Sequence, residues 1–170
     1  MNYYKFLDAD QTGRHSRKRL PIGEWITIEG PLAMCANGIH VTTIEHALEW
    51  LDERAHPVEI RGEHLVGDTK VCCREVFIHP AIPEWNERTR CLFAADCAER
   101  VLHLFEEAHP NDDRPRKAIE AARAFARGEI LADAMFAARD AARAARDAAR
   151  SAESRWQTER LAEILEARTR

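Results

Sequence analysis

In the first half of the chain, short stretches alternate apolar and polar residues, a period of two that is typical of half-buried β-strands. Glu24–Glu29 shows the alternation most clearly, and the other stretches are enriched in the β-branched and aromatic residues that strands favour. The expected strands are Tyr3–Leu7, Glu24–Glu29, Ile39–Val41, Val58–Ile60 and Lys70–Ile78. They predict a small, mostly antiparallel sheet.

A turn and a helix are expected on either side of the third strand. The dipeptide Asn37-Gly38 favours a tight turn before it. Thr42 is placed to cap a helix after it, and Glu45 three residues later completes a capping box. The apolar residues at helical spacing are Ile44, Ala47, Leu48 and Leu51.

From Trp85 onward the apolar period changes to that of helices. The expected apolar stripe of the first long helix is Phe93, Cys97, Val101, Leu104 and Phe105. Asp113 is expected to cap the next helix, with Pro115 tolerated in its first turn. Gly128 is expected to close that helix.

The last third of the chain contains a seven-residue repeat, Ala138–Ala144 followed by Ala145–Ser151. Alanine has the highest helix propensity, so this segment is predicted to be helical. Its methyl groups bury little area each, and such a helix needs a partner, either the preceding helices or another molecule. Bulkier anchor residues follow near the end of the chain, at Trp156, Leu161, Ile164 and Leu165.

These patterns predict an α+β fold, in which a small, mostly antiparallel sheet with packed helices is followed by an alanine-rich helical bundle or hairpin. A chain of 170 residues is long enough for both parts. We place the α+β domain at residues 1–110 and the helical domain at residues 111–170.

The charge distribution bears on the partner. Residues 1–110 carry 12 Lys and Arg against 18 Asp and Glu, a net charge of −6, whereas residues 111–170 carry 13 against 11, or +2. Neither part has the concentrated basic field of a general nucleic-acid binder, so we expect no direct nucleic-acid binding. The acidic half is too diluted by basic residues for a convincing nucleic-acid mimic.

The five cysteines are odd in number and lack the spacing of a secreted disulfide framework. No signal peptide opens the sequence, and no apolar run approaches the roughly 20 residues that span a bilayer. We therefore expect a cytoplasmic protein of a bacterial host cell, with free thiols and no membrane partner.

Cys35, His40, Cys72 and Cys73 are the candidates for metal binding or thiol chemistry. Cys35 and His40 have four residues between them, a spacing that zinc ligands use. The vicinal pair Cys72-Cys73 fits a zinc site poorly, because adjacent strand residues point to opposite faces. A cysteine nucleophile would need an activating histidine and an orienting third group, for which there is no local signature. We expect no metal, no cofactor and no catalytic residue, and we leave open whether these four residues have a chemical role.

The order of elements, with a later strand that contains Glu75, resembles ADP-ribosyltransferase-like folds. The resemblance implies an aromatic-rich cleft for NAD and a glutamate that orients the ribose. It rests on spacing alone, and the arginine or histidine expected near the first strand is not evident. An enzyme of this type is therefore an alternative hypothesis.

The first half also resembles DUF7666, a domain of unknown function found mainly in phage and prophage genomes. The resemblance covers about residues 3–80 and rests on the segments Lys5-Phe6-Leu7, Pro21–Trp25, Cys35–His40 and Asp68–Cys72. The family typically shows a cysteine and then a Gly-Phe-His-Ala-Cys-like turn, and here Val41-Thr42 stands where Ala-Cys is usual. The loss of that second cysteine argues against a metal or redox role.

The segment Asn111–Arg123 resembles the helical region of immunity proteins, in which a similar Asp-x-Arg-Pro-Arg-x-Ala-Ile motif precedes alanine-rich helices. Both resemblances imply mobile-element biology. The leading hypothesis is a phage- or mobile-element-encoded inhibitor that binds a bacterial defence component, as an anti-CRISPR protein does, or a toxin. A homo-oligomeric module that pairs through the alanine-rich helix is a further alternative. The candidate partner-binding residues are Arg139, Asp140, Arg143, Arg146, Asp147 and Arg150.

Overall fold

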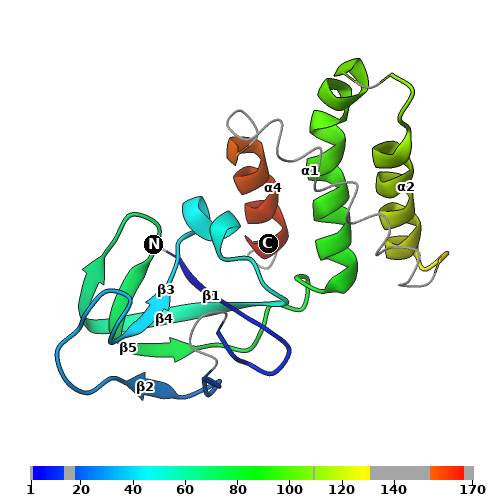
Figure 1. Ribbon diagram of the computed structural model, residues 1–170. Coiled ribbons are helices and arrows are strands. Elements are labelled where there is room, and N and C mark those ends of the chain that lie inside the picture. Colours follow the sequence, from blue (N-terminus) through cyan, green and yellow to red (C-terminus); the bar gives the residue numbers. More distant parts are fainter. Residues whose placement is uncertain (1, 14–17, 109, 131–153, 167–170) are drawn as a thin grey trace. The chain divides into compact units, whose positions relative to one another are not determined.

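The computed structural model describes residues 2–13, 18–108, 110–130 and 154–166 (Figure 1). By their contacts, the residues fall into two units. The sheet unit comprises Met1–Trp85 together with Leu165–Arg170, and the helical unit comprises Asn86–Ile164. The first long helix therefore belongs with the helices that follow it, whereas the expected division at residue 110 grouped it with the sheet. The division into an α+β domain at residues 1–110 and a helical domain at residues 111–170 stays a prediction.

The predicted α+β class is confirmed, because the sheet unit contains a five-stranded sheet whose pairings are all antiparallel. The strands are β1 (Tyr3–Leu7), β2 (Trp25–Thr27), β3 (Ile39–Val41), β4 (Arg54–Val66) and β5 (Val71–Ile78). Their order is β1-β4-β5-β2, and β3 pairs with the first part of β5 (Figure 1). Strands far apart in sequence therefore meet at β5.

Strand β4 is much longer than the predicted Val58–Ile60. Its register against β5 shifts between Arg61 and His64, and Gly62 within the shift has a φ of 71°. Such a bulge breaks the period of two, and glycine accommodates the positive φ without strain. The strand continues beyond the bulge as an exposed ribbon to Val66.

One core cluster of the sheet unit is built almost entirely from aliphatic side chains. Leu7, Val76 and Ile78 are completely buried. The other buried members of this core are Leu20, Ile39, Val41, Val58, Val71 and Cys73. Burial of these side chains supplies the hydrophobic stabilisation of the unit, roughly 25 cal/mol per Å² of apolar surface.

The helix expected after β3 is a six-residue 3₁₀ helix, Ile44–Glu49, and the predicted capping box is wrong. The backbone of Thr42 pairs with that of Tyr4, and its hydroxyl donates to the carbonyl of Thr69 at 3.0 Å. Thr42 therefore extends the sheet and does not cap a helix. Thr43 precedes the 3₁₀ helix without a side-chain cap, and its hydroxyl donates to Glu45.

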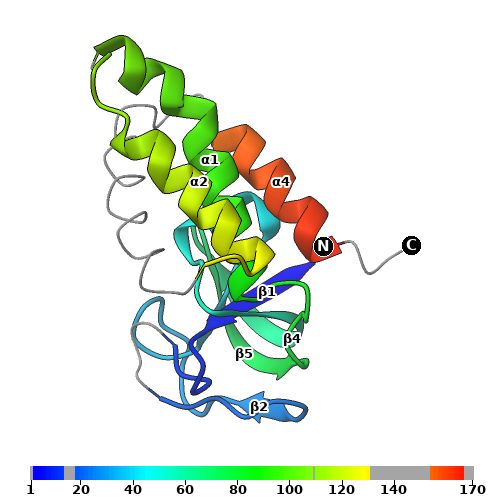
Figure 2. The same ribbon diagram turned by 90° about the vertical axis from the view of Figure 1, so that its right-hand side faces the viewer.

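The helical unit contains α1 (Glu87–Ala108) and α2 (Arg114–Arg127), which lie side by side, and α4 (Ser154–Glu166), of which residues 154–164 belong to this unit (Figure 2). The start of α2 after Asp113, with proline in its first turn, is confirmed, as is its end at Gly128 with a φ of 79°. The carboxylate of Asp113 does not cap the helix but pairs with Lys117 at 2.7 Å.

Small residues dominate the contact between α1 and α2. The cluster consists of Ala95, Ala98, Leu102 and Ile119, with Ala122 packed against it. Phe93 and Val101 of the predicted stripe are buried, but Leu104 is 41% exposed, so the prediction was wrong at that residue. The contact is instead formed largely by alanines, whose small side chains let the two helix backbones approach closely.

Charged side chains connect α1, α2 and α4 at Asp96 of α1. Its carboxylate lies 3.1 Å from Arg123 of α2 and 3.6 Å from Arg160 of α4. Arg123 also bonds Glu99 at 2.6 Å, and this pairing lowers the pKa of the Glu99 carboxyl. Of the predicted anchors on α4, Leu161 and Leu165 are buried and Ile164 is half-buried, whereas the side chain of Trp156 lies outside the described residues.

Candidate functional site

The cysteine–histidine motif forms a compact turn before β3. The turn runs from Ala33 to Asn37, whose N–H donates to the carbonyl of Ala33 at 2.8 Å, so it lies before the predicted Asn37-Gly38 dipeptide. Cys35 adopts a positive φ of 63°, and its N–H donates to Nε2 of His40 at 3.1 Å. The ammonium of Lys70 donates to the Cys35 thiol at 3.0 Å.

Gly38 is required by close packing against β5. A Cβ atom at this position would lie 2.2 Å from Sγ of Cys72, and its φ of 140° is one that other residues rarely adopt. The buried Cys72 thiol lies 3.4 Å from the carbonyl oxygen of Asn37, and burial raises its pKa. Burial also raises the pKa of Cys73, to about 12, which keeps this core thiol protonated. Glycine at position 38 is thus explained by the packing of the turn against the Cys72 side chain.

Among the residues that the structure describes, no three or more His, Cys, Asp or Glu side chains are grouped so that they could hold a metal ion. Nε2 of His40 already accepts the N–H of Cys35, and Cys73 lies in the aliphatic core. The motif therefore offers no ligand set, and only Cys35 of these thiols is exposed.

Lys5 is a half-buried cation beneath the same motif. Its ammonium donates to the carbonyl of His40 at 2.7 Å, and burial lowers its pKa to about 8. The pKa of the His40 imidazole is lowered by burial and by the charges of Lys70 and Lys5. These contacts hold β1 against β3.

Three aromatic side chains lie in a row from β2 to the end of β5, and we call Trp25, Phe77 and His79 the aromatic row. The ring centroids of Trp25 and Phe77 are 5.7 Å apart, and those of Phe77 and His79 are 4.8 Å apart. The guanidinium of Arg61 lies 3.9 Å from the centroid of the Trp25 ring, and Trp25 remains 36% exposed. Tryptophan and arginine are enriched at the centres of protein interfaces.

Glu75, the residue of the ADP-ribosyltransferase hypothesis, lies beside this row. Its carboxylate pairs with Arg61 at 2.7 Å, and it does not line the pocket described next. The pairing holds Arg61 in place over Trp25.

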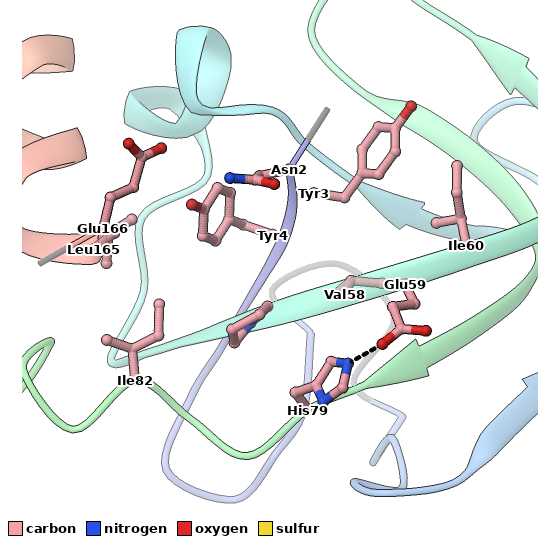
Figure 3. Close-up of a pocket in the computed structure, with 11 residues that line it drawn as sticks. Asn2, Tyr3, Tyr4, Val58, Glu59, Ile60, His79, Ile82, Leu165 and Glu166 are labelled. Carbon is pink, nitrogen blue, oxygen red and sulfur yellow. Dashed lines mark hydrogen bonds and ion pairs between the residues drawn. The ribbon is translucent and has the colours of Figure 1, made fainter. Parts of the chain in front are cut away.

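A pocket of about 510 Å³ adjoins the aromatic row and lies within the sheet unit (Figure 3). We call it the acidic pocket, because among its described lining residues Glu59 and Glu166 are acidic and none is Lys or Arg. The lining residues are Asn2, Tyr3, Tyr4, Pro57, Val58, Glu59, Ile60, His79, Ile82, Leu165 and Glu166. His79 belongs to both the row and the pocket, so the two form one continuous surface.

One carboxylate of the acidic pocket is held by a histidine ring. Nε2 of His79 lies 2.8 Å from the Glu59 carboxylate. Burial, together with the charge of Glu166, raises the pKa of the Tyr4 hydroxyl. Figure 3 shows the His79–Glu59 pair on one side of the pocket and Glu166 on the other.

The pattern of the sequence does not predict this surface. Trp25 is placed in a strand by its alternation, but its contact with Phe77 depends on the register of β2 against β5. The pocket joins four segments that are distant in the sequence. All six predicted partner-binding residues, from Arg139 to Arg150, lie outside the described residues, and they stay a prediction.

Comparison with known proteins bears on the helical unit. Residues 81–164 match the model of a family described as "Imm-5 like putative immunity protein", a match that covers just under half of the chain. It begins upstream of the segment Asn111–Arg123 that carries the sequence resemblance, and it includes the whole of α1. The helical unit is therefore similar to an immunity-protein family.

No curated protein and no solved structure matches the chain. The resemblance of residues 3–80 to the phage-associated domain stays a prediction. In the part of the chain that the structure describes, no helix has both the length and the apolar character needed to cross a membrane.

Proposed function

We propose that this protein is an immunity-type inhibitor, which binds a toxic protein and neutralises it without catalysis. The observation that carries the proposal is the match of residues 81–164 to the immunity-protein family. An inhibitor of this kind needs a preformed binding surface on a rigid scaffold, since order already present in the free protein does not have to be gained on binding.

The geometry of both units supports a binding role. In the helical unit, the ion pairs at Asp96 hold α1, α2 and α4 together. In the sheet unit, the aromatic row presents Trp25 and Arg61 on strands, where their positions are fixed by register. We propose the aromatic row as one contact surface and the predicted set Arg139, Asp140, Arg143, Arg146, Asp147 and Arg150 as another.

Neutralisation is the test of this proposal. Candidate toxic proteins, chosen from those encoded beside the gene of this chain, are expressed in bacteria with and without it. An immunity-type inhibitor restores growth and forms a complex that elutes as one species in gel filtration. If every candidate remains toxic and forms no complex, the proposed function is wrong.

Two sets of variants then separate the contact surfaces. Trp25→Ala is expected to weaken the complex by about tenfold or more, as buried aromatic anchors do. Thr27→Ala, in the same strand but outside the row, is the matched control and is expected to leave the affinity unchanged. Replacement of Arg143, Arg146 and Arg150 by Gln tests the second surface in the same assay.

The earlier alternatives receive less support. Glu75 is engaged by Arg61 and lies outside the acidic pocket, so no feature of the site favours an NAD-dependent reaction. Self-association through the alanine-rich helix stays a prediction, and sedimentation of the purified protein tests it. Whether the target is a toxin or a component of bacterial defence is decided by the neutralisation assay.

A further inference from the structure

We infer that two copies of this chain pair through the outer edge of β2, so that their sheets join into one continuous sheet across a two-fold axis. The contact is made by the backbone N–H and C=O groups of Trp25 and Thr27, which we call the open edge. The inference goes beyond the proposed function, because it concerns the assembly of the free protein. Three observations carry it: the direction of these backbone groups, the protection of the other edges, and a sequence that is complementary to itself.

The backbone groups of β2 point in two directions. Ile28 donates its N–H to the carbonyl of Arg74 at 2.9 Å, so its backbone faces β5. Alternate residues of an antiparallel strand direct both backbone groups to the same neighbour. The groups of Ile26 therefore also face β5, whereas those of Trp25 and Thr27 face away from it. Figure 1 shows β2 at the margin of the sheet.

The open edge is short but accessible. In the part of the chain that the structure describes, no hydrogen bond reaches the backbone N–H or C=O of Trp25 or Thr27, and both residues are exposed. The edge ends before Glu29, whose carbonyl accepts the side-chain amide of Asn37 at 2.9 Å. Each residue of the open edge offers one donor and one acceptor, at the spacing that an antiparallel neighbour requires.

The other edges of the sheet are protected against a further strand. The outer side of β1 is bonded through Tyr4 to Thr42, which follows β3. Pairing of β1 with β4 ends at Val58, and beyond it β4 has the bulge at Gly62 and several charged side chains. Bulges and charges of this kind oppose strand addition, and β2, Trp25–Thr27, has neither. Among the described strands, β2 is therefore the one with an edge that accepts another strand.

The sequence of β2 favours a second copy as that strand. A two-fold axis through Ile26 places Trp25 of each copy opposite Thr27 of the other. Both pairs then use the backbone groups that face away from β5, which gives four hydrogen bonds related by the axis. This is the self-complementary arrangement that a two-fold dimer needs.

The residues on either side of the open edge are also compatible with this register. Glu24 lies opposite Ile28 of the second copy, and Glu29 lies opposite Gly23. Like charges directly opposite one another destabilise a pair of strands, and this register contains none. The charges of the chain therefore do not oppose the pairing.

Both faces of the joined sheet gain contacts. On one face, the half-buried Ile26 packs against the aliphatic core and is covered by Ile26 of the second copy. On the other face, Trp25 lies beside Thr27 of the second copy, so the two aromatic rows meet at the axis. The charge of Arg61 above Trp25 is compensated within its own copy by Glu75 at 2.7 Å. The dimer thus presents one aromatic surface of double length.

The first experiment is sedimentation equilibrium of the full-length protein over a series of concentrations. Because two short strands bury little area, we expect a reversible dimer with a dissociation constant of about 100 µM or tighter. The mean mass should rise from 19.4 kDa towards twice this value. A mass of 19.4 kDa at every concentration up to about 1 mM overturns the inference.

Thr27→Pro tests whether the open edge makes the dimer. Proline lacks the N–H that faces outward and is tolerated on an edge strand, so the variant removes two of the four bonds and leaves the pairing with β5 intact. We expect the dissociation constant to rise at least tenfold. Thr27→Ala keeps the N–H and is the matched control, with an unchanged dissociation constant. A dimer that Thr27→Pro does not weaken uses another surface, such as the alanine-rich helix, and overturns the inference.

Hydrogen exchange of the unmodified protein gives a test that does not depend on the folding of a variant. The amides of Trp25 and Thr27 should exchange at least tenfold more slowly in concentrated than in dilute protein. Those of Ile26 and Ile28, which face β5, should be protected at both concentrations. If the mass doubles while exchange at Trp25 and Thr27 stays fast, the copies meet elsewhere and the inference is wrong.

Discussion

The sheet unit and the helical unit are stabilised by different interactions. The sheet unit has an aliphatic core and close packing around β5, where Gly38 leaves room for the Cys72 thiol. The helical unit has a core made largely of alanine, and its helices are joined by charged side chains at Asp96. Small side chains bury little apolar area, so the helical unit depends more on electrostatic contacts.

This difference has a consequence for stability. Steric changes are expected to damage the sheet unit most, while changes of charge and of salt concentration are expected to act mainly on the helical unit. Because one unfolding transition need not report both units, hydrogen exchange of segments 18–85 and 86–130 is the appropriate readout beside denaturant unfolding.

The largest effect is expected for Gly38→Ala. The added Cβ would lie 2.2 Å from Sγ of Cys72 in a backbone conformation that alanine rarely adopts. Overpacking and backbone strain together should cost about 3 kcal/mol of unfolding free energy, with faster exchange in the sheet unit. Urea unfolding measures the cost.

Gly23→Ala is the control for the backbone contribution, since Gly23 has a φ of 84° but no atom within 4 Å of an added Cβ. It should cost about 1 kcal/mol. If the two variants were equally stable, the close approach of Cys72 would not be the cause. The double variant Gly38→Ala/Cys72→Ala should recover part of the lost stability, because it removes the obstructing sulfur.

A smaller effect is expected for Asp96→Asn in the helical unit. The substitution keeps the size of the side chain but removes the charge that Arg123 and Arg160 share. We expect a loss of about 1.5 kcal/mol at low salt, since charge-assisted bonds in a network exceed an isolated surface pair. Hydrogen exchange should place the loss in residues 86–130.

The salt dependence distinguishes this explanation from a packing defect. At roughly 1 M salt the Debye length falls to about 3 Å, and the cost of Asp96→Asn should shrink. Glu129→Gln removes an exposed partner of Arg127 and should leave stability nearly unchanged, because solvent screens such a pair. A loss at Asp96 that is independent of salt would show that packing, not charge, joins the helices.

The sequence predicts elements best where one local signal dominates. The strand Tyr3–Leu7 follows from its aromatic residues, and the end of α2 follows from Gly128, whose φ of 79° is the expected helix-terminating conformation. The length of β4 could not be predicted, because the bulge at Gly62 interrupts the alternation on which strand prediction depends. Thr42 fits a capping box by spacing, but its backbone is used by Tyr4.

The surface site was less predictable than the fold for a physical reason. The acidic pocket exists only because β1 and β4 pair in one register and because residues 165–166 lie near them in the same unit. No periodicity encodes such a juxtaposition. Helix α1 shows the same limit, since Leu104 has the spacing of a core residue but is 41% exposed, whereas Ala95, Ala98 and Leu102 form the contact with α2.

A dependence of stability on pH is expected at Lys5, a half-buried cation of the sheet unit. Burial lowers the pKa of Lys5 to about 8 from the 10.5 of the unfolded chain, so between these values the unfolded state binds more protons than the folded state. The free energy of unfolding therefore rises with pH between about 8 and 10.5. Below pH 8 the ammonium is charged in both states, and its desolvation lowers the stability of the folded protein by the full amount.

Replacement by methionine removes this dependence. Lys5→Met should be more stable than the unmodified protein at neutral pH, even after losing the bond to the His40 carbonyl, and its advantage should decline as the pH rises towards 10.5. Lys5→Arg is the matched control, because arginine keeps its charge at every pH in the window. It should become progressively less stable than the unmodified protein. Stability differences that stay constant across this window would show that the pKa of Lys5 is not lowered by folding, and therefore that its ammonium is solvated in the folded state.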